Sequence, residues 1–167
     1  MRKFVLILAV VACCVSACQN ISCPLDNVVM LKMSMYSGNE KARVLDTLTV
    51  TLEGRDSVLV NRIYNFDEVQ LPLRQNASGE VTDTFLLHWS LATGEEGETP
   101  VRVTDTLTVR HGCTVHFESM DCPSSVFHHL IDATCSRGLA DSVSINNPAV
   151  DYEHYENLRL YLSPLSE

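Results

Sequence analysis

The sequence predicts an all-β protein, a two-sheet antiparallel β-sandwich of the immunoglobulin-like kind. Along most of the chain, apolar residues alternate with polar ones at a period of two, which is typical of half-buried strands and not of helices. Clusters of Gly, Asn, Asp and Ser separate these runs at short intervals, and such clusters form turns. Many short strands with regular turns are typical of a sandwich or barrel.

The alternating runs give the expected strands in order. They cover residues 29–35, 44–52, 58–63, 69–73, 85–91, 101–109, 115–117, 143–145 and 158–162. Residues 124–134 also have some helical character, but the strands on either side favour β-structure. Trp89 lies on an alternating apolar face and is expected in the core. We expect Val50 and Leu107 to point inward as well.

One segment of the sequence occurs twice. Residues 42–50 are echoed by residues 101–109, and the two copies share the five consecutive residues Asp-Thr-Leu-Thr-Val. Two copies are too few for a solenoid. We interpret them as equivalent strands, one in each sheet or one in each half of a pseudo-duplicated sandwich. In each copy, Asp46 or Asp105 is expected to begin the strand and bind backbone amides at the turn.

The N-terminus has the order of a secretory signal peptide. Arg2 and Lys3 precede an apolar run over residues 4–12, which is too short to span a membrane. Small residues then precede Cys18, and this segment resembles a lipobox, in which the cysteine is lipidated and becomes the mature N-terminus. Cys13 also fits the pattern but would leave a shorter apolar run.

These features predict three segments. Residues 1–17 are the signal peptide, residues 18–26 are the lipidated N-terminus and a short tether, and residues 27–167 are one β-sandwich domain. Two acyl chains are enough for stable membrane anchoring. Residues 19–22 lack the acidic residues of a surface-export tag, so we expect an outer-membrane anchor facing the periplasm.

The charge of the chain excludes one class of partner. Loss of Arg2 and Lys3 with the signal peptide changes the formal charge from −9 to −11. An acidic chain without a basic patch repels phosphate backbones, so no nucleic acid is expected to bind. The expected partners are the membrane, through the lipid, and an envelope protein or glycan.

Four cysteines remain after the signal peptide and the lipidated residue are set aside: Cys23, Cys113, Cys122 and Cys135. An even number in an oxidising compartment favours two disulfides, and three connectivities are possible. We favour Cys23–Cys122 and Cys113–Cys135, because the second pair flanks an apparent hairpin that turns near residues 121–124.

The same stretch suggests a metal site as an alternative. Its candidate ligands are His111, Cys113, His116 and Cys122, and imidazole and thiolate are ligands for zinc or copper. Paired Cys-x-x-Cys or His-x-x-x-His spacings are missing, however, and cysteines of exported proteins tend to be oxidised. Adjacent His128 and His129 are expected to face opposite sides of a strand. Structural disulfides are therefore favoured, and no metal or other cofactor is expected.

Four Asp-Ser/Thr-aliphatic triplets resemble the sequence used for O-glycosylation of exported proteins in Bacteroidetes. Their hydroxyl residues are Thr47, Ser57, Thr106 and Ser142. The alternative is that Asp-Thr and Asp-Ser simply begin strands well. Modification would require an exposed hydroxyl.

Taken together, the lipobox, the second cysteine that follows it and the paired Asp-Thr-Leu-Thr-Val strands resemble an uncharacterised family of small Bacteroidetes lipoproteins. Further parts of the resemblance are Leu71-Pro72-Leu73, the Ser119–Cys122 step and the segments 141–145 and 157–162. The resemblance implies the location and the fold, and it implies no activity. The sequence also lacks a Gly-x-Ser-x-Gly elbow. We therefore predict a non-catalytic binding or structural module.

Overall fold

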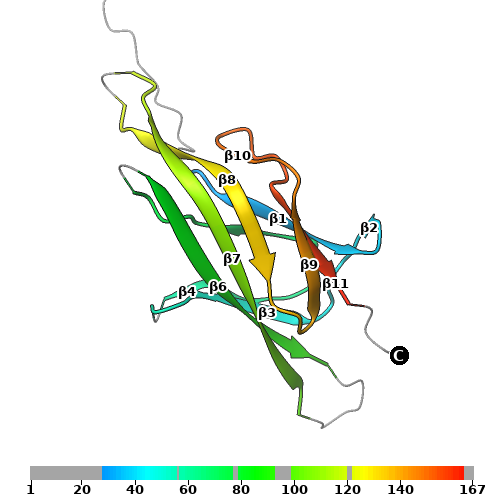
Figure 1. Cartoon of the computed structure of the whole chain (residues 1–167). Coiled ribbons are helices and arrows are strands. Elements are labelled where there is room, and N and C mark those ends of the chain that lie inside the picture. Colours follow the sequence, from blue (N-terminus) through cyan, green and yellow to red (C-terminus); the bar gives the residue numbers. More distant parts are fainter. Residues whose placement is uncertain (1–27, 56, 77–78, 93–98, 120–121, 164–167) are drawn as a thin grey trace, which may run out of the picture.

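The computed structural model describes residues 28–55, 57–76, 79–92, 99–119 and 122–163 (Figure 1). These residues form eleven strands in two sheets that pack against each other, so the prediction of an all-β sandwich is confirmed. The expected signal peptide, Cys18 and the tether lie outside the described residues. Within the described ranges there is no helix of the length and apolarity needed to cross a membrane.

The larger sheet has six strands in the order β10-β8-β7-β6-β3-β4, and every pairing in it is antiparallel. Its strands are β3 (Thr47–Leu52), β4 (Val58–Ile63), β6 (Glu80–Leu91), β7 (Val101–His116), β8 (Ser125–Cys135) and β10 (Ala149–Val150). The long strands β6 and β7 form its centre and run diagonally through Figure 1.

The smaller sheet has five strands. They are β1 (Leu31–Ser37), β2 (Glu40–Lys41), β5 (Glu68–Leu71), β9 (Ala140–Ile145) and β11 (Leu158–Leu162). Strand β1 pairs with β11 in parallel and with β2 and β5 antiparallel, and β11 pairs with β9 antiparallel. This sheet therefore departs from the expected antiparallel pattern at one pairing, where the first and last described strands meet.

The core lies between the two sheets and follows the predicted alternation. Trp89, Val50 and Leu107 of the larger sheet are at most 1% exposed, as predicted. Met33 and Leu160 of the smaller sheet belong to the same buried cluster. Burying apolar side chains of this size stabilises a domain by about 1.5–3 kcal/mol each. The period-two pattern therefore placed these residues of the larger sheet correctly, whereas Val101 and Phe117, which also belong to the alternating runs, are exposed.

Some strand boundaries differ from the prediction. The run 101–109 and residues 115–116 belong to one continuous strand, β7, because all of its residues from 101 to 116 pair with β6 or β8. Phe117 lies just beyond the end of this strand. Residues 124–134, which had some helical character, form β8 as predicted. Strand β6 begins at Glu80, where its pairing with β7 continues beyond the apolar run.

The interpretation of the repeated segment was wrong. Strands β3 and β7 lie in the same sheet, on either side of β6, so the repeat does not reflect a pseudo-duplicated sandwich. The two copies are also offset along the sheet, since Leu48 lies opposite Trp89 whereas Leu107 lies opposite Phe85. Asp105 therefore falls in the middle of a strand and does not begin one.

Asp105 instead joins the two sheets. Its carboxylate is fully buried and accepts hydrogen bonds from Trp89 Nε1 (3.1 Å), Ser136 Oγ (2.9 Å), Gly138 N (2.7 Å), Leu139 N (2.9 Å) and Ala140 N (2.9 Å). The last three amides lie where the chain passes from β8 to β9, in the other sheet. A Cβ atom at Gly138 would lie 2.6 Å from Asp105 Oδ1, so only glycine permits this close approach.

Candidate metal centre

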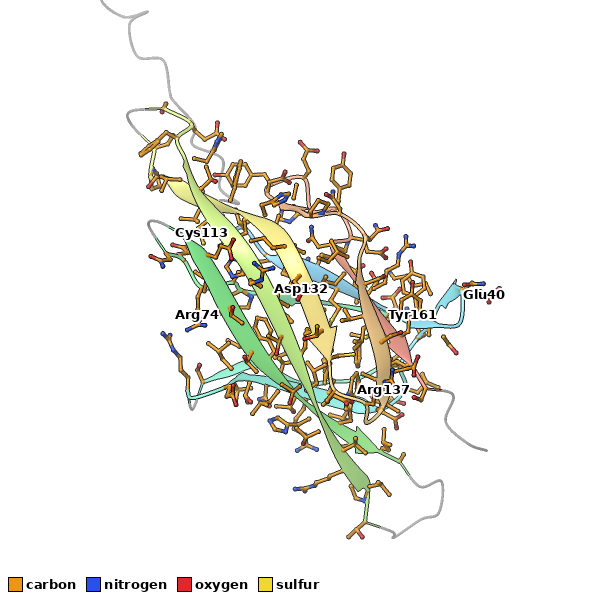
Figure 2. The ribbon with its side chains drawn as sticks, viewed as in Figure 1. Glu40, Arg74, Cys113, Asp132, Arg137 and Tyr161 are labelled. Carbon is orange, nitrogen blue, oxygen red and sulfur yellow. The ribbon has the colours of Figure 1, made fainter. Side chains whose placement is uncertain are left out.

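Three potential metal ligands meet on the inner face of the larger sheet. His111 and Cys113 belong to β7, and His128 belongs to β8. One ligand atom from each residue lies within 4.8 Å of the other two. Figure 2 labels Cys113 on β7 and also labels Arg74, which lies beside β6. We call these three residues the His/Cys cluster.

The pairing of β7 and β8 explains why these three residues meet. Cys113 lies opposite His128, and His111, two residues earlier, points to the same face. A register shift between Arg110 and His111 leaves Ile131 without a partner on β7. This bulge changes which residues of β8 face inward, so His128 is buried and His129 is exposed. The prediction that the two adjacent histidines face opposite sides is confirmed.

The separations between the ligand atoms match those around a single bound ion. His111 Nδ1 lies 3.2 Å from His128 Nδ1, and Cys113 Sγ lies 3.5 Å from His128 Nδ1 and 3.8 Å from His111 Nδ1. Tetrahedral zinc has metal–nitrogen bonds of about 2.05 Å and metal–sulfur bonds of about 2.3 Å. These bonds place two nitrogens about 3.3 Å apart, and a nitrogen and a sulfur about 3.6 Å apart.

Asp83 orients one of the imidazoles. Its fully buried carboxylate accepts a hydrogen bond from His111 Nε2 (3.0 Å) and another from the Arg74 backbone N–H (2.9 Å), and Arg74 Nε also donates to it. Burial favours a higher pKa for Asp83, but the hydrogen bonds from His111 and Arg74 outweigh it and lower the pKa. An ionised Asp83 only accepts, so Nε2 of His111 carries a proton, and Nδ1 is the ring atom that faces the cluster.

His128 is held in its neutral form. Burial, together with the charge that His111 would carry, lowers the pKa of His128 to about 4, although Asp83 acts in the opposite direction. Neutral imidazole is the form that binds metals. His128 is therefore in the protonation state of a ligand near neutral pH, and the hydrogen bond to Asp83 orients the His111 ring.

Cys113 provides the soft ligand of the cluster. It is a free, half-buried thiol, and its Sγ lies 3.7 Å from the backbone oxygen of Arg74, to which it can donate. Thiolate and imidazole together favour zinc and copper over magnesium or calcium. Three protein ligands leave a fourth position of a tetrahedral ion for another donor.

The sequence identified only part of this cluster. Of the four alternative ligands, His111 and Cys113 are brought together, whereas His116 and Cys122 are not members. His116 stacks on Phe127, with ring centroids 4.3 Å apart, and its Nε2 lies 3.2 Å from Glu118 Oε1. Cys122 is disulfide-bonded. No spacing between residues indicates His128 as a ligand, because His128 reaches the cluster through strand pairing.

The predicted Cys113–Cys135 disulfide was wrong, since both cysteines are free thiols. Cys135 lies opposite Leu107, six residues along β7 from Cys113, which corresponds to about 20 Å. His116 pairs with Ser125, so the hairpin turns earlier than that disulfide requires. Cys23, the expected partner of Cys122, lies outside the described residues, and this bridge stays a prediction.

The four candidate glycosylation residues lie in different surroundings. Ser57 and Ser142 are exposed, whereas Thr47 and Thr106 are half-buried. Asp105, which precedes Thr106, is engaged in the buried contacts described above. Ser142 Oγ lies 3.4 Å from the carboxylate of its own triplet, Asp141. Modification at all four positions stays a prediction.

Comparison with known families places the chain in one of them. A model for a family of unknown function, DUF6452, matches residues 47–162, which is well over half of the chain. The chain belongs to this family. The part that matches DUF6452 includes the His/Cys cluster, Asp83 and Arg74. No curated protein and no solved structure matches the chain. Membership of DUF6452 confirms the resemblance to an uncharacterised family, whereas the bacterial source and the lipid anchor stay predictions.

Proposed function

We propose that this protein is a lipid-anchored envelope protein whose β-sandwich binds a soft transition metal, zinc or copper, through His111, Cys113 and His128. The observation that supports the metal site is the meeting of two imidazole Nδ1 atoms and one thiol at separations suited to a single ion. This proposal replaces the expectation that no metal binds. It assigns binding to the cluster, and no catalytic step.

Binding of the ion is coupled to loss of a proton. The thiol of Cys113 loses its proton to become the thiolate ligand, and the ion takes the place of that proton between sulfur and the two rings. His128 must present the Nδ1 lone pair, so its single proton moves to Nε2. Asp83 keeps the proton of His111 on Nε2 throughout, which leaves Nδ1 available to the ion.

Titration of the purified, reduced protein with Zn²⁺ and Co²⁺ tests this proposal. We expect one ion per chain and, with Co²⁺, a sulfur-to-metal charge-transfer band. Cys113→Ser should lower the affinity at least about 100-fold, and Asp83→Asn about 10–100-fold through loss of the His111 hydrogen bond.

Matched controls are available within the same hairpin. Cys135→Ser removes the other free thiol of the described residues, and His129→Gln removes the exposed neighbour of His128. Both variants should bind the ion as the wild type does. If Cys113→Ser and Cys135→Ser reduce binding equally, or if the wild type binds no ion, the metal site is wrong.

The anchor is proposed from the order of charged, apolar and small residues that ends at Cys18. We expect the wild-type protein to sediment with membranes and to carry acyl mass on residue 18, whereas Cys18→Ser leaves a soluble or unprocessed protein. Cys13→Ser, at the other position that fits the pattern, should remain anchored. A soluble wild-type protein without acyl mass would contradict the anchor. An outer-membrane, periplasm-facing location and an envelope protein or glycan partner are proposed on the same basis.

A further inference from the structure

We infer a second binding site, for a phosphate monoester, in a cleft on the outer face of the larger sheet. The cleft has a volume of about 410 Å³ and is separate from the His/Cys cluster, which lies on the inner face. Its lining includes the side chains of Arg62, Arg102 and His88 and the hydroxyl residues Thr47, Thr49, Ser90 and Thr104. Volumes of this size hold small-molecule ligands.

Strand pairing builds the floor of the cleft. Thr49, His88 and Thr104 lie directly opposite one another on β3, β6 and β7. The imidazole of His88 is held between hydroxyls, with Nδ1 3.1 Å from Thr104 Oγ1 and Nε2 3.1 Å from Thr51 Oγ1. The floor is therefore polar, hydrogen-bonded and fixed across three strands.

Two arginines stand on opposite sides of this floor. Arg62 belongs to β4 and Arg102 to β7, three strand spacings apart, which corresponds to about 14 Å between their backbones. Long side chains from both sides can reach an anion that lies between them. Guanidinium groups bind phosphate oxygens through two parallel hydrogen bonds.

Arg62, which lines the cleft, has an unusual backbone conformation. Its φ of 49° lies in the left-handed region, which is sterically unfavourable for a non-glycine residue. The pairing of β3 with β4 also shifts register on both sides of Val50, and the Arg62 N–H donates to Thr49 Oγ1 (3.3 Å). Bulges of this kind redirect side chains near binding sites, and local strain is concentrated at such sites.

The charges around the cleft favour an anion. Among the residues that the structure describes, no Asp or Glu lines it, although the chain has a formal charge of −9. Neither Arg62 nor Arg102 forms an ion pair with any described residue, and the same holds for Arg43, Arg55 and Arg137, which lie outside the cleft. Two unpaired guanidinium groups balance a dianion. A phosphate monoester carries a charge of about −1.5 to −2 and three strong acceptor oxygens for the surrounding hydroxyls.

NMR titration of the ¹⁵N-labelled protein with glycerol 3-phosphate, inorganic phosphate and glycerol tests the site. We expect saturable shifts at Thr49, His88 and Thr104 with both phosphates, stronger binding of the ester, and no shift with glycerol. Arg62→Gln and Arg102→Gln should each weaken binding at least about 10-fold, which corresponds to about 1.4 kcal/mol. Arg137→Gln, at an exposed arginine outside the cleft (Figure 2), should leave it unchanged.

The outcomes also separate this site from the metal site. Cys113→Ser should bind the phosphates as the wild type does, so failure of one proposal leaves the other intact. Equal weakening by Arg137→Gln and the two cleft variants would indicate a general charge effect and overturn the site. Shifts that do not saturate, or that lie away from the cleft, would overturn it too.

Discussion

Replacing Asp105 with alanine is expected to lower the free energy of unfolding by about 4 kcal/mol, because several buried donors lose a charged acceptor at once. The carboxylate accepts from Trp89 Nε1 and from three consecutive backbone amides that lead into β9. The variant should therefore loosen the connection between the two sheets and not only the strand that carries the mutation.

Chemical denaturation followed by circular dichroism measures this effect. Asp105→Asn keeps the size of the side chain but turns an NH₂ group towards N–H donors, so about 2–3 kcal/mol should still be lost. Asp132→Ala is the matched control, because Asp132 is an exposed carboxylate on the neighbouring β8 (Figure 2). It should change stability by no more than about 0.5 kcal/mol. Equal midpoints for the Asp105 and Asp132 variants would contradict the role of Asp105.

Acidification from pH 6.5 to pH 4 is expected to destabilise the metal-free protein through His128. The pKa of His128 falls from its ordinary value of 6.5 in the unfolded chain to about 4 in the fold. Between these values the unfolded chain binds a proton that the folded chain does not, so stability decreases as the pH falls. The difference between 6.5 and about 4, at about 1.4 kcal/mol per pKa unit, makes the full loss about 3 kcal/mol.

Unfolding measured at pH 7, 5.5 and 4 tests this prediction with two variants. His128→Gln should remove most of the loss in this window, whereas His129→Gln, at the exposed neighbour, should retain it. Asp83 acts at lower pH, because its pKa is lowered from 3.8 and its stabilisation is lost only as the pH falls further. A wild-type protein with constant stability from pH 6.5 to pH 4 would contradict the neutral, buried His128.

The two sites differ in how they depend on the fold. The His/Cys cluster lies at the buried inner face, where burial lowers the pKa of His128 and Asp83 orients the ring of His111. Metal binding there is therefore sensitive to the packing of β7 and β8. The phosphate cleft lies on the outer face, and its charged groups are exposed. Substitutions there should change binding without changing stability much.

The sequence by itself determined the fold class and the faces of the strands. Side chains alternate across a strand whatever its partner is, so local alternation was enough to place Val50, Trp89 and Leu107 in the core. It was also enough to predict that His128 and His129 face opposite sides.

Only the tertiary structure decided which side chains come together across neighbouring strands. The bulge at Ile131 directs His128, and not His129, towards Cys113, and the hairpin register keeps Cys113 away from Cys135. Asp105, expected to bind a local turn, instead binds amides more than thirty residues away. Register, bulges and contacts of this kind depend on the pairing partner and on packing between sheets, which a single strand's pattern does not encode.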